Sequence, residues 1–114
     1  MSPPLVMIES PLRGDYELNI AYARACMRDS IARGEAPFAM HLLYAQDGVL
    51  DDRIPEERAK GIAAGLAWAA KADLVAVYCD LGISDGMNLA IRAAEARGCP
   101  VVYRCKTLSE PPAR

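Results

Sequence analysis

The sequence predicts an α/β fold in which helices cover a parallel sheet. Short apolar runs alternate with longer segments whose apolar residues recur every three or four positions. The runs lack polar–apolar alternation, which is typical of strands that are covered on both faces. The clearest unit has a strand at residues 74–79, a loop at 84–87, a helix ending before Gly98 and a strand at 100–105. This is the order of a βαβ unit.

The N-terminal half begins with the same pattern. We expect a strand at residues 5–8 that ends before Pro11, because proline cannot donate to a sheet. Asp15 is a suitable N-cap for a helix over residues 16–33, and Gly34 is a suitable terminator.

The middle of the chain supplies another strand and another helix. A strand is expected at residues 37–42, and a polar loop at 44–54 follows it. Pro55 suits the first turn of a helix over residues 55–72. The last helix is expected at residues 85–97.

These elements give the order β-α-β-α-β-α-β in a single domain over residues 1–108. Right-handed crossovers then lead to a four-stranded parallel sheet in the order 2-1-3-4, a shortened flavodoxin-like three-layer fold. The tail at residues 109–114 contains two prolines and is expected to fray.

Composition excludes several classes of partner. The chain has 114 residues and a net charge of −2, with 13 basic residues against 15 acidic ones, so binding of nucleic acid is not expected. No apolar stretch reaches the roughly 18 residues of a membrane span, and the N-terminus lacks the form of a signal peptide. We therefore expect a cytoplasmic protein that does not bind membranes.

The four cysteines lack the spacing of a metal site, and no motif indicates a cofactor. In a reducing cytoplasm, free thiols are the expected state. Cys79 and Cys105 could nevertheless face each other at the ends of neighbouring strands.

The loop after the first strand is the first candidate site. Ser10 and Arg13 offer a hydroxyl and a guanidinium beside a helix start, Gly14 could let the backbone approach a ligand, and Asn19 follows in the helix. The pattern is neither a dinucleotide-binding nor a Walker motif. A plain turn with an N-cap is about equally compatible with these residues.

The loop after the third strand is the second candidate. Ser84 can cap the next helix while the backbone N–H groups of Gly86 and Met87 face the crevice. Asp85 adds a negative charge that would repel a phosphate but could accept hydrogen bonds from sugar hydroxyls. Asp80 ends the strand and is a candidate for contacting the substrate. Alternatively, Asp85 merely complements the helix dipole.

Other polar residues carry weaker signals. His41 is the only histidine and is expected near the carboxyl end of the second strand, where it could contact a ligand or be structural. Asp51 and Asp52 could bind a metal, but two adjacent carboxylates without further ligands are more typical of a solvated loop.

Three segments together resemble the nucleoside 2-deoxyribosyltransferase family, in particular its small phage and bacterial relatives of unassigned function. They are residues 9–20, with Ser10-Pro11-Leu12-Arg13-Gly14-Asp15, then residues 51–66, with Pro55-Glu56-Glu57-Arg58, and residues 82–101, with Ser84-Asp85-Gly86-Met87. The resemblance implies a flavodoxin-like fold and a pocket for a nucleoside or nucleotide at the strand ends. It also implies oligomers, so a homo-oligomer is a further expectation.

The resemblance breaks at the reactive centre. The family's nucleophilic glutamate lies four residues after the glycine of the last loop, where this chain has Ala90. An aromatic residue of the family's first loop is replaced by Leu12. These departures favour binding without turnover. Two alternatives remain: an N-glycosidase or deoxyribosyltransferase that uses Asp80 or Asp85, with Arg13 and Asn19 positioning the ligand, and an oligomeric structural protein with a vestigial site.

Overall fold

The computed structural model describes residues 2–105, so the tail predicted at 109–114 lies outside the described residues. Within this range the elements are β1 (Leu5–Glu9), α1 (Tyr16–Ala32), β2 (Ala36–Phe38), α2 (Met40–Leu43), α3 (Pro55–Ala69), β3 (Leu74–Val77), α4 (Asp85–Ala96) and β4 (Val101–Tyr103). The described strands form one parallel sheet in the order β2-β1-β3-β4. The predicted α/β architecture and the strand order 2-1-3-4 are confirmed.

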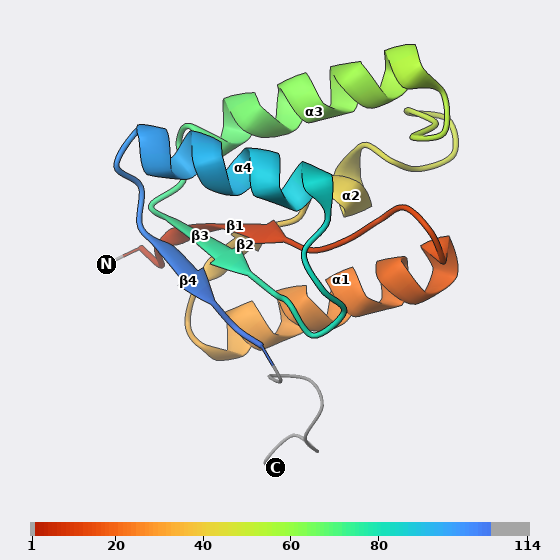
Figure 1. Ribbon diagram of the computed structural model, residues 1–114. Coiled ribbons are helices and arrows are strands. Elements are labelled where there is room, and N and C mark those ends of the chain that lie inside the picture. The colour runs from red at the N-terminus through yellow and green to blue at the C-terminus, as the bar shows by residue number, and fades with distance from the viewer. Residues whose placement is uncertain (1, 106–114) are drawn as a thin grey trace.

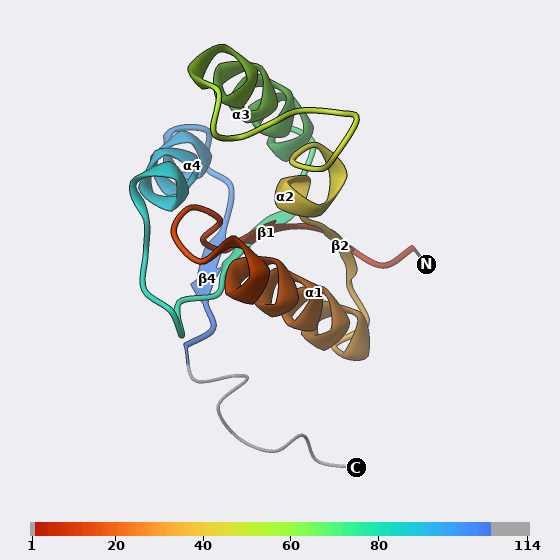
Figure 2. The same ribbon diagram turned by 90° about the vertical axis from the view of Figure 1, so that its right-hand side faces the viewer.

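The sheet lies between two layers of helices. Helix α1 covers one face, and α3 and α4 lie together over the other (Figures 1 and 2). Successive residues of β1 point to opposite faces: Val6 and Ile8 pack in the core on the α1 side, and Met7 packs in the core on the α3–α4 side. This alternation also decides which polar residues reach the site.

The helices α1 and α4 begin at the N-cap residues that the sequence predicts. The Asp15 side chain accepts a hydrogen bond from the N–H of Leu18 at the start of α1. The Ser84 hydroxyl accepts one from the N–H of Met87 at the start of α4. Pro55 occupies the first turn of α3, where its missing N–H costs nothing. The predicted helix starts are therefore confirmed, although α3 ends at Ala69 rather than at residue 72.

The second strand is shorter than predicted. It pairs with β1 only through Ala36, Pro37 and Phe38, after which the chain turns into the short helix α2. Residues 40–43 are Met-His-Leu-Leu, which contains good helix formers and no β-branched residue. Helix α2 packs closely on α3 because Gly65 has no Cβ at the position that the Met40 side chain occupies. His41 therefore lies on a helix and not at a strand end.

The expectation of free thiols is wrong for two of the cysteines. Cys79 and Cys105 form a disulfide with a Cα–Cα distance of 4.8 Å. The pairing is a consequence of the sheet order, because both residues follow neighbouring parallel strands, β3 and β4. Cys26 and Cys99 are free.

Across residues 2–105, no helix combines the length and the apolar character that crossing a bilayer requires.

Candidate functional site

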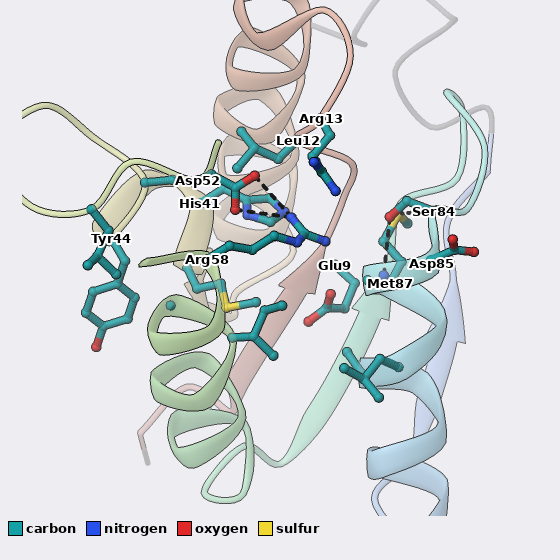
Figure 3. A pocket seen from close by; sticks show the side chains of 18 of the residues that line it. Glu9, Leu12, Arg13, His41, Tyr44, Asp52, Arg58, Ser84, Asp85 and Met87 are labelled. Atoms are coloured by element: carbon teal, nitrogen blue, oxygen red, sulfur yellow. Dashed lines mark hydrogen bonds and ion pairs between the residues drawn. The ribbon is translucent and has the colours of Figure 1, made fainter. Parts of the chain in front are cut away.

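A cavity of about 260 Å³ lies at the carboxyl ends of β1 and β3 and extends between α3 and α4. Figure 3 shows it from close by. Strand β1 has β2 on one side and β3 on the other, so the order in which successive strands are added to the sheet reverses at β1. Ligands of open α/β sheets bind at such a switch point. The apolar part of the lining includes Leu12, Met40, Leu50, Ile62, Leu66 and Ala90.

The loop after β1 brings Arg13 to the cavity. Its side chain points toward the cavity in Figure 3 and forms no ion pair with a described residue. The buried side chain of Asn19 fixes this loop by donating to the carbonyls of Leu12, at 2.9 Å, and Arg13, at 3.0 Å. Gly14 has φ 104°, a conformation that favours glycine, and it turns the chain into α1. Asn19 and Gly14 therefore shape the loop but do not line the cavity.

The N-terminus of α4 forms the opposite wall. Ser84, Asp85, Gly86 and Met87 all line the cavity. Arg58 reaches this wall from α3, because a Cβ placed on Gly86 would lie 3.5 Å from Arg58 Nη2. The guanidinium of Arg58 thus spans the cavity between the two helices.

His41 lines the cavity but has a structural bond. Its Nε2 lies 2.8 Å from the carbonyl oxygen of Ser10. Since a carbonyl only accepts, Nε2 carries a proton and donates. Burial lowers the pKa of His41, which favours the neutral ring.

Ser10 and Asp80 lie outside the cavity lining. Ser10 comes directly after β1; it is 1% exposed, and its hydroxyl has no hydrogen-bond partner among the described residues. Asp80 is bonded to α1, where the Tyr22 hydroxyl donates to its Oδ2 at 3.0 Å. Neither residue lines the cavity.

The predicted site residues therefore divide into two groups. Those that line the cavity are Arg13, His41, Ser84, Asp85, Gly86 and Met87. Those that do not are Ser10, Gly14, Asn19 and Asp80. The expectation that Ser10 and Asp80 share one cleft with Arg13, Ser84 and Asp85 is wrong for those two, because Asp80 is bonded to Tyr22 of α1 and Ser10 is not part of the lining.

Glu9 also lines the cavity, although it is not among the site residues predicted from the sequence. It is 5% exposed and ends β1. Its side chain forms no hydrogen bond or ion pair with a described residue, and burial raises the pKa of its carboxyl to about 8. The signal was present in the sequence, since Glu9 follows Met7 in the period-two alternation of a strand.

An ion pair between Arg58 and Asp52 at the cavity was likewise not predicted from the sequence. Arg58 Nη1 lies 3.0 Å from Asp52 Oδ2 and 3.2 Å from Oδ1, and both side chains are largely buried. The Tyr16 hydroxyl donates to the same carboxylate at 3.3 Å. Asp52 is thus not a solvated loop residue, because it connects the loop after α2 to both α1 and α3.

The polar side chains that line the cavity can bind a ligand by charge and hydrogen bonding. Among residues 2–105, no three His, Cys, Asp or Glu side chains gather as a metal site would require. Ala90 lines the cavity and offers no nucleophile at its position. The polar groups that remain are the Arg13 and Arg58 guanidinium groups, the Glu9 and Asp85 carboxyls and the N-terminus of α4.

Comparison with known proteins places the chain by family. A search of curated proteins finds no match. Residues 4–104, which include every element of the fold and every lining residue of the cavity, match a domain family described as a domain of unknown function. The chain therefore belongs to the DUF7768 family.

Proposed function

We propose that the protein binds a nucleoside-like or nucleotide-like small molecule in the cavity at the carboxyl ends of β1 and β3. The observation that carries the proposal is the combination of an apolar wall with a few convergent polar groups at the switch point of the sheet. Small-molecule sites typically have this composition and this position. The resemblance of the sequence to nucleoside 2-deoxyribosyltransferases supports the same class of ligand.

The polar groups suit the parts of such a ligand. The apolar wall, including Leu66 and Ala90, can pack against the faces of a base. Asp85 can accept hydrogen bonds from sugar hydroxyls. Arg13 can bind an anionic group such as a phosphate, whereas Asp85 disfavours one at the N-terminus of α4.

The size of the cavity restricts the ligand. Its volume of about 260 Å³ is slightly below the range of roughly 300–1,000 Å³ that is usual for small-molecule sites. A single nucleoside or mononucleotide is therefore favoured over a dinucleotide.

Binding without base exchange is the form of the proposal that we favour. Ala90 supplies no carboxylate where the related transferases have their nucleophile, so a covalent sugar intermediate cannot form there. Of the two carboxylates on which the alternative of an N-glycosidase or transferase was based, only Asp85 lines the cavity, whereas Asp80 is bonded to Tyr22 of α1.

A homo-oligomer belongs to the same proposal. Ile83 and Leu89 are 42% and 45% exposed beside the N-terminus of α4, and Leu89 also lines the cavity. A second copy packed on them would lie at the cavity rim. Sedimentation equilibrium of the wild type against Leu89→Gln tests this, with a monomeric wild type contradicting it.

Ligand binding is tested with saturation-transfer NMR against a panel of nucleosides and 5′-mononucleotides, followed by calorimetry on those that bind. We expect Arg13→Gln to weaken nucleotide binding about tenfold, which is the loss of one charge-assisted contact. We expect Ala90→Leu to weaken binding of nucleosides and nucleotides alike by filling the cavity. Thermal unfolding of each variant shows whether it remains folded.

The matched control is Arg24→Gln. Arg24 is also an exposed arginine, but it lies on α1 and does not line the cavity. It should bind as the wild type does. If no member of the panel binds, or if the Arg13 and Ala90 variants both bind like the wild type, the proposal is wrong.

A further inference from the structure

We propose that Glu9 recognises the ligand as a neutral carboxylic acid, whose O–H and C=O pair with an adjacent acceptor and donor such as the pairing edge of a nucleobase presents. This inference rests on the proposed function and deepens it, because it names the part of the ligand that Glu9 would contact.

The position of Glu9 points to this role. The residue is the last of β1, on the face of the sheet that α3 and α4 cover, and it lines the cavity while being 5% exposed. Figure 3 shows its carboxyl group directed into the space between these two helices. A ligand that enters the cavity would therefore reach this group.

The carboxyl group has no partner of its own among the described residues. The titratable or charged side chains that share the cavity with it are Arg13, His41, Tyr44, Asp52, Glu57, Arg58 and Asp85. Arg58 is paired with Asp52, Glu57 accepts from the N–H of Asp51, and His41 donates to Ser10. No hydrogen bond or ion pair connects any of these side chains to Glu9.

A buried carboxyl without a cation favours its protonated form, since burial disfavours the charge. The pKa of Glu9 is raised to about 8, so the group is mostly uncharged at neutral pH. Burying a polar group without a hydrogen bond has a cost, and a ligand that supplies the missing bonds recovers it.

The protonated group selects a particular chemistry. A neutral carboxyl offers one donor and one acceptor side by side, whereas a carboxylate offers acceptors only. The donor–acceptor pair is complementary to the N–H and C=O of uracil or hypoxanthine, and to the N and NH₂ of adenine or cytosine. Guanine presents the same C=O and N–H pair as hypoxanthine, but its second adjacent donor also suits a carboxylate.

Calorimetry with defined nucleosides tests this assignment. The probes are uridine, inosine, adenosine and cytidine, together with 3-methyluridine and 1-methylinosine, in which a methyl group blocks the pairing edge. The proteins are the wild type, Glu9→Gln, which keeps a neutral donor and acceptor, and Glu9→Leu, which keeps only the approximate size. Circular dichroism and thermal unfolding show that each is folded.

We expect at least one unmodified nucleoside to bind, and the blocked form of uridine or inosine to bind at least tenfold more weakly than its parent. Glu9→Leu should weaken binding at least tenfold below about pH 8, where the wild-type carboxyl is protonated. Wild-type affinity should fall about tenfold for each pH unit above about 8, whereas Glu9→Gln should not show this fall for adenosine or cytidine.

The possible failures are distinguishable. If no nucleoside binds the wild type, the proposed function is wrong and this inference falls with it. If nucleosides bind but respond neither to Glu9→Leu nor to the blocking methyl groups, the site stands and the role of Glu9 is wrong. Carbon-13 NMR of the Glu9 carboxyl in the free protein gives a separate result, and a pKa near 4.5 would also overturn the inference.

Discussion

The Tyr22 hydroxyl binds Asp80 at two points: it donates to Oδ2 at 3.0 Å and accepts from the backbone N–H at 2.9 Å. Tyr22 lies on α1, and Asp80 lies in the loop that leads from β3 to Ser84, the N-cap of α4. The wall of the cavity formed by α4 is therefore positioned in part from the opposite side of the sheet.

Replacing Tyr22 with phenylalanine should lower the stability of the fold. The change removes both hydrogen bonds while keeping the ring in the core, and we expect a loss of about 1–2 kcal/mol in the free energy of unfolding. Urea unfolding measures this loss. Tyr103→Phe is the control, because Tyr103 is 53% exposed, and it should change stability little. Equal stability of the two variants would contradict the prediction.

Glu9 should make stability depend on pH in a direction that is unusual for a carboxyl group. The unfolded chain loses the proton near the ordinary pKa of 4.5, whereas the folded protein keeps it up to about 8. Between these values unfolding releases a proton, so the free energy of unfolding falls as the pH rises and then levels off. The span corresponds to a loss on the order of 5 kcal/mol.

Glu9→Gln isolates this effect from the other titrating groups. The variant should match the wild type near pH 4 and be more stable than the wild type at pH 8. Urea unfolding at several pH values measures the difference. If the two proteins differ by the same free energy of unfolding at every pH, the pKa of Glu9 is the same in the folded and the unfolded chain and the prediction is wrong.

The Arg104–Glu35 ion pair should be costly to break. Arg104 donates to Glu35 from Nη1 at 2.9 Å and from Nη2 at 2.6 Å, and both side chains are about nine-tenths buried. Arg104→Met would leave the Glu35 carboxylate buried without its cation, which typically costs about 3–5 kcal/mol.

Neutralising the remaining partner tests the cause of that loss. Adding Glu35→Gln to Arg104→Met should recover part of the stability, because no unpaired charge then remains. Thermal or urea unfolding of the single and double variants gives the comparison. A double variant less stable than Arg104→Met would mean that loss of packing, not the unpaired charge, dominates.

The strand order and most helix starts could be predicted from local signals. Unbroken apolar runs such as residues 5–8 indicate covered strands, and Asp15, Pro55 and Ser84 mark helix starts through their own chemistry. The end of β2 could not be placed in the same way. Residues 39–43 are apolar enough for a strand, and the turn into α2 depends on how Met40 packs against Gly65.

The site could be located but its members could not all be assigned. The sequence indicates that the site lies at the strand ends. The face of the sheet to which each side chain points, however, changes with every residue along the strand, so an error of one residue assigns it to the wrong face. Glu9 lines the cavity, whereas Ser10, the next residue, does not. Likewise, the contribution of Asp52 depends on Arg58 and Tyr16, which meet it only in the folded protein.

The protein should show little or no transfer of deoxyribose between bases. Ala90 lies on α4 one turn after Gly86, lines the cavity and is 8% exposed, so a carboxylate at this position would face the proposed ligand site, but alanine supplies none. Asp85 lies at the exposed start of the same helix. A nucleophile displaced by about 1 Å from its productive geometry can cost roughly a hundredfold in rate.

Restoring the carboxylate tests whether Ala90 is what limits the reaction. Thymidine incubated with adenine and analysed by chromatography should show no new nucleoside with the wild type and a slow appearance of deoxyadenosine with Ala90→Glu. Ala90→Gln is the matched control, because it has the same size without a nucleophile, and it should be inactive. Rapid exchange by the wild type that Asp85→Ala abolishes would instead identify Asp85 as the nucleophile and the protein as an active transferase.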